Sequence, residues 1–440
     1  MRPLVFLLLC LVGLTGRTEA QPAPASLNPA ELQELTALYQ QLHAAPELSG
    51  QEVQTAALLA GQLRALGYEV SEGVGRYERP GWASHGVVAV LRHGSGPTVM
   101  VRADMDGLPV EEKTGLPYAS QVRTKAESGQ ETGVMHACGH DVHVACLIGL
   151  ARVLARSRDQ WQGTLVLVGQ PAEEVVAGAK GLLADGLYTR FPRPDFVLAL
   201  HDHAELAAGR VALCPGYALA SSTSVDLLIR GIGGHGSKPE TARDPVVVAA
   251  QVVLALQTIV SREVPPLEAA VVTVGSIHGG TKHNIIPAEV KLQLTVRTYK
   301  EEIRRQILAS IERIARGTAQ AAGIPDSLAP VVKEVQYVPA TYNDPALTQR
   351  LSDALAITLG PGQVGPWPPV MAGEDFAYYR LDGQIPTCLF WLGAVDPALV
   401  AGGGPLPSLH SAFFAPVPEP ILNTGVSAMA AAVLELLGKP

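Results

Sequence analysis

Residues 135–143 read MHACGHDVH and open a helical pattern. They place five ionisable or metal-binding side chains within eight residues, a density that ordinary packing does not explain. Cys138 and His140 are two positions apart and cannot share a helix face, so as metal ligands they must lie on the turn before the helix. The segment has three interpretations: a metal site, a buried cysteine beside a helix cap formed by Asp141, and a Cys–His nucleophilic pair.

Short, almost wholly apolar runs lie on both sides of this segment in the sequence. They comprise residues 87–91, 98–101, 165–168, 196–200 and 389–392. Two helical patterns, 29–43 and 51–66, precede the first run, and Asn28 with Glu31 predicts a capping box at the start of the first helix. Apolar runs of this length, separated by helical stretches, are typical of strands buried on both faces of a sheet. The sequence therefore predicts an α/β domain with a mostly parallel central sheet.

Most of the other candidate ligands come directly after one of these runs. Asp104 and Asp106 follow the second run, Glu173 and Glu174 follow the third, and His201 follows the fourth. In open α/β sheets the binding crevice lies at the carboxyl ends of the strands, so we expect these side chains to converge. His410 lies in a loop near the chain end, and by itself it is typical of a surface histidine.

The stretch from 218 to 340 has a different pattern. In residues 291–298, Leu292, Leu294 and Val296 alternate with Gln293, Thr295 and Arg297. Such alternation indicates a sheet with one covered face and one face in water. The predicted order is strand, helix, strand, strand, helix, which indicates a small ferredoxin-like α+β domain inserted into the larger one. We therefore divide the chain into 21–217 and 341–440, which form the larger domain, and the insert 218–340.

Residues 1–20 are typical of a secretory signal peptide, with Arg2 before an apolar run from Leu4 to Leu14 and a small residue, Ala20, at the end. Eleven apolar residues are too few for a membrane anchor. We expect an exported protein, periplasmic or extracellular. The formal net charge of −8 and the pI near 5.9 argue against nucleic acid as a partner.

After the leader, four cysteines remain: Cys138, Cys146, Cys214 and Cys388. An even number in an oxidising compartment ordinarily suggests two disulfides, although four cysteines are too sparse for a disulfide scaffold. If Cys138 is a metal thiolate, three remain, and paired disulfides are no longer the natural inference.

Several motifs in order resemble one family: the metal-dependent amidohydrolases that include hippurate hydrolases, carboxypeptidases acting on N-acylated amino acids, and hydrolases of indole-acetic-acid amino-acid conjugates. The matching stretches are LHAAPELS (42–49), RADMDGLP (102–109), MHACGHDVH (135–143), QPAEE (170–174), GGHG (233–236), GTKHNIIP (280–287) and GEDF (373–376). The resemblance implies a two-domain aminoacylase/carboxypeptidase-like fold whose insert serves as a lid and dimerisation domain.

The resemblance also implies a two-metal centre. Its ligands would be Cys138 as the bridge, His140, Glu174, His201 and His410. This donor set suits Zn²⁺ and also admits Mn²⁺, Co²⁺ or Ni²⁺. Glu173 would act as general base and then acid, and Asp106 would orient a ligand histidine. The implied reaction is hydrolysis of an N-acyl amino acid by metal-activated water.

In the lid, the resemblance makes His235 a stabiliser of the tetrahedral oxyanion and Asn284 a residue that hydrogen-bonds the substrate. A turn histidine and a turn asparagine are the plain structural interpretations. The expected assembly is a homodimer or homotetramer formed through the lid, and the sequence leaves open whether His235 acts in its own subunit or in a partner's.

The chain departs from the family pattern at DHAE (202–205), where His203 could compete as a ligand and Asp202 and Glu205 add negative charge. Three other functions stay open. A dipeptidase or carboxypeptidase would act on exported peptides. A metal-holding binding protein would need neither Glu173 nor His235. A cysteine hydrolase that uses Cys138 would keep its activity in the presence of a chelator.

Overall fold

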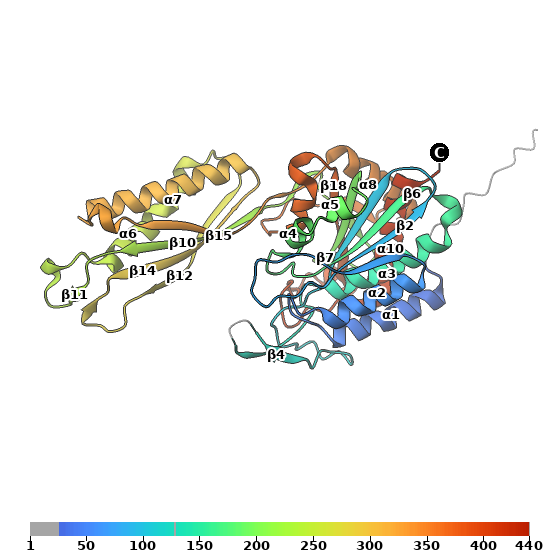
Figure 1. Cartoon of the computed structure of the whole chain (residues 1–440), viewed down its shortest axis with the longest axis horizontal. Helices are drawn as coiled ribbons and strands as arrows, with labels where there is room; N and C mark the ends of the chain where they lie inside the picture. Colours follow the sequence, from blue (N-terminus) through green and yellow to red (C-terminus); the bar gives the residue numbers. More distant parts are fainter. Residues whose placement is uncertain (1–25, 127–128, 440) are drawn as a thin grey trace, which may run out of the picture.

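The computed structural model describes residues 26–126 and 129–439, which form a larger and a smaller lobe (Figure 1). The predicted leader, residues 1–20, lies outside the described residues. The larger lobe is built on an eight-stranded sheet. In spatial order its strands are β1 (Glu69–Val74), β2 (Gly86–His93), β6 (Gly163–Gln170), β3 (Thr98–Asp104), β7 (Phe196–Ala207), β18 (Thr387–Val395), β8 (Val211–Leu213) and β17 (Val364–Pro366).

The centre of this sheet is parallel, as the sequence predicts. Strands β6, β3, β7 and β18 run in the same direction, whereas β1 and β2 on one side and β8 on the other pair in antiparallel fashion. Each of the five predicted apolar runs lies within one of the strands β2, β3, β6, β7 and β18. All nine residues of β18 are buried, which explains why its sequence carries no alternation.

Five long helices cover one face of the sheet. They are α1 (Pro29–Ala44), α2 (Val53–Ala65), α3 (His140–Arg156), α8 (Pro345–Leu359) and α10 (Pro418–Leu437). Helix α1 begins with the predicted capping box between Asn28 and Glu31. Helix α10 is long and apolar enough to cross a membrane, but 72% of its apolar window is buried against α3, α8 and their neighbours. Its composition is that of a core helix.

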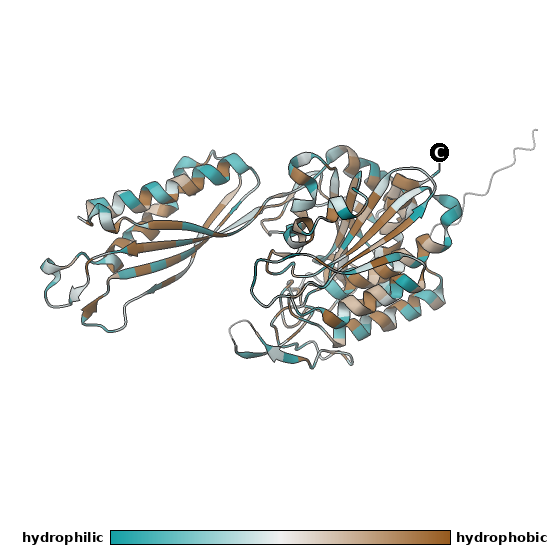
Figure 2. Ribbon diagram, in the orientation of Figure 1, coloured by the Kyte–Doolittle hydropathy of each residue, from teal (hydrophilic) through white to brown (hydrophobic). Residues whose placement is uncertain are grey.

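Shorter segments cover the opposite face of the sheet. These are α4 (Gly178–Ala184), α5 (Leu187–Arg190) and the 3-10 segment η5 (Asp375–Gly383), and they pack on a second apolar cluster that includes Val88, Met100 and Val168. Because helical segments lie on both faces, the central strands are apolar throughout, and Figure 2 shows them as the most hydrophobic part of the larger lobe.

The smaller lobe, which we call the lid, contains a four-stranded antiparallel sheet and two helices. Its elements are β10 (Ser221–Arg230), α6 (Pro245–Thr258), β12 (Ala270–Gly279), β14 (Glu289–Thr298), α7 (Glu301–Ala321) and β15 (Val331–Val338). The sheet order is β12-β14-β10-β15. This βαββαβ order is ferredoxin-like, and β15 is the strand that the sequence did not predict. Most residues of β15 are exposed, and its sequence has no regular alternation of apolar and polar residues.

The alternation predicted for 291–298 is present in β14. Leu292, Leu294 and Val296 are buried beneath α6 and α7, whereas Gln293, Thr295 and Arg297 lie on the other face of the sheet. The chain enters the lid through β9 (Gly216–Leu219) and leaves it through β16 (Thr341–Asn343), and these two segments pair with each other. The lid is therefore joined to the larger lobe by two adjacent strands.

Candidate metal centre

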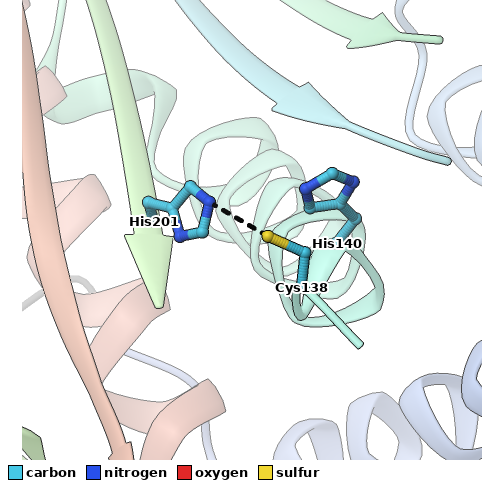
Figure 3. Close-up of side chains that lie close together, drawn as sticks. All are labelled: Cys138, His140 and His201. Carbon is cyan, nitrogen blue, oxygen red and sulfur yellow. Dashed lines mark hydrogen bonds between the residues drawn. The ribbon is translucent and has the colours of Figure 1, made fainter. Parts of the chain in front are cut away.

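Three parallel strands and the start of α3 bring the predicted ligands to one edge of the central sheet. Strand β3 ends at Asp104, β6 ends three residues before Glu173, and β7 carries His201. Cys138 lies on the turn before α3, and His140 is the first residue of that helix. Figure 3 shows the side chains of Cys138, His140 and His201 facing one another.

The distances define one cluster around Cys138. Its Sγ lies 3.7 Å from His201 Nε2 and 3.3 Å from His410 Nε2. Glu174 Oε1 lies 3.6 Å from His410 Nε2 and 3.9 Å from His140 Nε2. Two groups of possible ligands, Cys138 with His140 and His201, and Cys138 with Glu174 and His410, each have their ligand atoms within 4.8 Å of one another. Both groups share the thiol, as a bridging ligand would.

The hydrogen bonds of the cluster leave ligand atoms facing its centre. His140 Nδ1 donates to the carbonyl of Asp106 at 2.8 Å, and His201 Nδ1 donates to the carbonyl of Asp202 at 2.8 Å. Each bond fixes a tautomer in which Nε2 is free to ligate. His140 Nε2 and Glu174 Oε1 are buried without a hydrogen-bond partner among the described residues. Buried polar atoms are normally satisfied, so these two fit a cation.

His410 reaches the cluster from a distant loop. Its backbone N–H donates to the carbonyl of Ala137 at 2.8 Å, which fastens this loop to the turn before α3. The backbone of His410 has a positive φ of 65°, an uncommon conformation for a residue other than glycine. The residue that resembled a surface histidine in the sequence is thus held beside the thiol.

Asp106 holds both glutamates in place. Its carboxylate accepts hydrogen bonds from the backbone N–H groups of Glu173 (3.2 Å) and Glu174 (3.0 Å) and from Ser49 Oγ (2.6 Å). Although burial raises the pKa of Asp106, its contacts with His140 bring that pKa below the usual value. Asp106 is therefore a buried anion that orients the predicted ligand Glu174 and its neighbour Glu173.

Glu173 faces a pocket of about 360 Å³ that Cys138, His201 and His410 also line. Burial, together with the charges of Glu374 and Glu174, raises the pKa of Glu173 well above its usual value. The turn that carries the two glutamates has positive φ at Ala172 (58°) and Val176 (55°). Such backbone strain outside glycine persists where the surrounding structure enforces it.

A second layer of charges lies beneath the cluster. His143 contacts Asp104 through Nδ1 and Asp202 through Nε2, the latter at 2.8 Å. Asp202 is fully buried, so its charge contacts His143 beneath the cluster and does not lie on the pocket surface. Gly139, with φ of 76°, lies against it, and a Cβ there would overlap the Asp202 carboxylate.

Arg102 is a supporting residue that sequence reasoning missed. Its buried guanidinium contacts Asp104, Glu374 (2.9 Å) and Asp375 (3.1 Å), and it donates to Gln170 at 2.9 Å. It joins β3 to the GEDF motif. The available signal was a cation within an apolar strand, two positions before Asp104.

Two predicted site residues lie elsewhere in this chain. His235 is in β11 (Gly234–His235), which pairs with β13 (Ile285–Ile286), and Asn284 directly precedes that strand. Both residues are exposed, and β11 lies at the end of the lid farthest from the larger lobe (Figure 1). The structure brings His235 and Asn284 together with each other and not with the Cys138 cluster.

His203, the suggested competing ligand, has other contacts. Its ring packs against Trp367 and Trp391, with centroids 4.5 and 5.0 Å away, and its Nδ1 accepts from the backbone N–H of Glu205. All four cysteines of the described chain are free and buried. The disulfides that an even count suggests are absent from residues 26–126 and 129–439.

Comparisons with known proteins agree with this geometry. The model of peptidase family M20/M25/M40 matches residues 100–435. The chain is 38% identical to N-acetyl-L-cysteine deacetylase of Bacillus subtilis over 367 residues, which are 83% of this chain and 81% of the relative. It is 37% identical to hippurate hydrolase of Campylobacter jejuni over 341 residues, 77% of this chain and 83% of the relative.

A similar solved structure is a dinuclear metal-binding peptidase of the M20 family from Bacillus subtilis. The TM-score is 0.74 at 29% identity, and the match covers 93% of this chain and all of the other. The predicted resemblance is confirmed, and the family contains hydrolases named as deacetylases, amidohydrolases and carboxypeptidases. The chain therefore belongs to peptidase family M20/M25/M40 and is a hydrolase of linear amides.

Proposed function

We propose that this chain hydrolyses the amide bond of N-acyl amino acids at a centre of two divalent ions. The proposed ligands are Cys138, His140, Glu174, His201 and His410. The observation that carries the proposal is the convergence of these five donors. Two of them, His140 and Glu174, have a buried ligand atom that lacks a partner in the described chain. Such ions, when bound, lower the pKa of a water molecule and polarise the scissile carbonyl.

Glu173 supplies the proton transfers. It is 8% exposed, lines the pocket beside the proposed ligands and is fixed through its backbone by Asp106. A carboxylate whose pKa is raised by burial takes up a proton readily and returns it to a leaving nitrogen.

Arg297 supports a substrate that carries a carboxylate. It lines the same pocket from β14 of the lid, and it has no ion pair or hydrogen bond within the described chain. Burial lowers the pKa of this guanidinium, so an anion beside it would relieve an unfavourable desolvation. The free α-carboxylate of an N-acyl amino acid, which the reaction does not change, is such an anion.

The decisive experiment replaces the general base alone. We expect Glu173→Gln to keep two ions per chain by elemental analysis while kcat for hippurate and N-acetyl amino acids falls about 100- to 10,000-fold. Glu69→Gln, which changes an exposed carboxylate outside the pocket, is the matched control. Retained turnover in the Glu173 variant, or substantially fewer than two ions in metal-replete wild type, would contradict the proposal. Faster turnover of dipeptides than of N-acyl amino acids would favour the peptidase alternative.

We also propose a homodimer in which the lid of one subunit serves the site of the other. On α6, Val246, Val247 and Leu254 are 46%, 54% and 73% exposed, and Ile277 on the edge strand β12 is 55% exposed. Exposed apolar side chains beside an open strand edge are typical of an interface between proteins. His235 and Asn284, at the end of the lid, would reach the metal centre of the partner.

For localisation, we propose export with removal of the first twenty residues. The proposal is supported by the charged start and the short apolar run of residues 1–20. Sequencing of the amino terminus of the secreted protein should begin at Gln21, and an intact Met1 would overturn the proposal.

A further inference from the structure

A second cavity, of about 800 Å³, lies between the two lobes. It is next to the pocket of about 360 Å³ that Glu173 faces, which we call the metal-side pocket. We call it the basic cavity, because its charged lining residues are Arg76, Arg79 and Lys180 with Glu78. Val176, Ser224 and Gln336 line both spaces, so the basic cavity adjoins the pocket that Glu173 faces. Nothing in the proposed reaction uses these three cations.

The segment that carries the two arginines is fixed against α4. The backbone N–H of Arg76 donates to the carbonyl of Gly181 at 2.9 Å. The ring of Tyr77 lies so close to Gly181 that a Cβ at that position would overlap it. Arg79 packs its guanidinium over the ring of Trp82, 4.7 Å from the centroid. These contacts hold the segment at the cavity wall.

Lys180 projects from α4 toward the lid. Its Nζ donates to the carbonyl of Tyr337 at 3.2 Å and lies 4.8 Å from the centre of the Tyr378 ring. It forms no ion pair with a carboxylate of the described chain. Burial lowers the pKa of this amine, which leaves a partly desolvated cation at the cavity wall.

The charge of the cavity contrasts with that of the molecule. The chain has a formal net charge of −8, yet three cations and one carboxylate line this space. A concave region in which one sign of charge predominates raises the local concentration of ligands of opposite charge. The basic cavity is therefore suited to an anionic group that extends from the metal-side pocket.

The lid sheet places the junction of the two spaces close to Arg297, because Ser224 lines both of them. Ser222 pairs with Arg297, and Ser224, which lines the basic cavity, pairs with Thr295 two residues along β14. Two residues along a strand span about 7 Å. A glutamate side chain or a succinyl group on the substrate would extend from Arg297 toward that junction.

We propose that the basic cavity binds a second carboxylate of the substrate, so that dicarboxylic N-acyl amino acids are preferred. The inference rests on the proposed function, because Arg297 takes the α-carboxylate. The second carboxylate comes from the amino-acid side chain or from the acyl group. In either case Arg76 and Lys180 contribute charge-assisted hydrogen bonds that a neutral amide of the same shape does not gain.

The test compares isosteric acid and amide ligands. N-acetyl-L-glutamate is paired with N-acetyl-L-glutamine, and N-succinyl-L-leucine with its succinamoyl analogue. Binding is measured by calorimetry in the metal-loaded Glu173→Gln protein, which removes turnover. We expect tighter binding of the acid in at least one pair, and the pair that discriminates identifies the source of the carboxylate. Added salt should reduce the preference.

The variant Arg76→Gln/Lys180→Met should reduce the acid-over-amide affinity ratio about tenfold and leave amide binding unchanged. Arg76→Gln alone, at an exposed position, keeps the test valid if the double variant folds poorly. Arg305→Gln/Arg313→Gln, which removes two exposed cations of α7, is the control for net charge.

Equal affinity for acid and amide in both pairs, or an unchanged ratio in the cavity variants, would overturn the inference. Wild-type turnover of these four compounds is measured separately. If the wild type hydrolyses none of them while binding still depends on the basic cavity, the proposed function fails and the inference stands.

Discussion

Gly139 determines the geometry of the turn beneath the metal-side cluster. Its φ of 76° is unfavourable for other residues, and a Cβ there would overlap the Asp202 carboxylate that supports His143. We expect Gly139→Ala to lower the free energy of unfolding by about 1–3 kcal/mol and to reduce bound metal. Denaturant unfolding and elemental analysis measure the two effects.

Gly61→Ala is the control for that substitution. Gly61 lies within α2, and apart from the backbone of its own helix no atom lies within 4 Å of the position that a Cβ would occupy. Alanine should stabilise this helix slightly. If Gly139→Ala behaved like Gly61→Ala in both measurements, the proposed role of the turn would be wrong.

At the level of single residues, the sequence predicted chemistry better than it predicted support. Cys138 and His140 were recognisable because thiol and imidazole lie so close together in the chain. Arg102 and Arg297 were not singled out, because their significance depends on partners and pockets formed by residues hundreds of positions away. His410 by itself resembled a surface histidine, and only the resemblance to the family placed it in one metal centre with Cys138.

At the level of elements, a buried ion pair joins α1 to the start of α3. His43 Nδ1 lies 2.7 Å from Asp141 and Nε2 lies 3.1 Å from Glu112, and the three side chains are buried. Although burial alone would lower the pKa of His43, the two carboxylates raise it to about 10. Folding therefore increases the proton affinity of this imidazole.

The sign of the resulting pH dependence follows from that shift. The pKa of an unfolded histidine is about 6.5. The stabilisation by protonated His43 is therefore complete below about pH 6.5 and is lost as the pH rises through about 10. We expect His43→Gln to cost about 3–5 kcal/mol of unfolding free energy at pH 6 and less at pH 10. Urea unfolding at both pH values measures this difference.

His283→Gln, which changes an exposed histidine of the lid, should show no such trend. If the difference in unfolding free energy between wild type and the His43 variant stayed constant from pH 6 to pH 10, protonation of His43 would contribute nothing to stability.

The elements of the larger lobe were predictable where burial imposes a simple pattern. The apolar runs marked the central strands, and Asn28 with Glu31 marked the start of α1. In the lid, strand β15 was not predicted because it lies at the edge of the sheet and has the polar residues Lys333 and Glu334 in its middle. Strand β7 continues to Ala207, beyond its apolar run, because its polar end keeps pairing with β18.

At the level of the whole molecule, His235 lies far from the predicted metal centre of its own chain. Mixing two variants that we expect to be inactive tests whether it acts in the partner subunit. Glu173→Gln lacks the proposed base and His235→Ala lacks the lid histidine. If the lid acts in the partner subunit, a reassembled equal mixture should recover about a quarter of wild-type activity. Activity is assayed after denaturation and joint refolding of the two proteins.

Each variant refolded alone is the control, and it should stay inactive. No recovery in the mixture, with dimers shown by ultracentrifugation, would mean that His235 acts within its own chain or not at all.

The pairing of β9 with β16 has one more consequence. Leu219 and Thr341 are backbone partners, so the chain leaves the larger lobe and returns to it at the same place. The whole insert occupies the position of a hairpin loop, and a two-residue turn could close the gap in its absence. A single recombination event can therefore add, exchange or delete the lid without changing the register of the catalytic sheet.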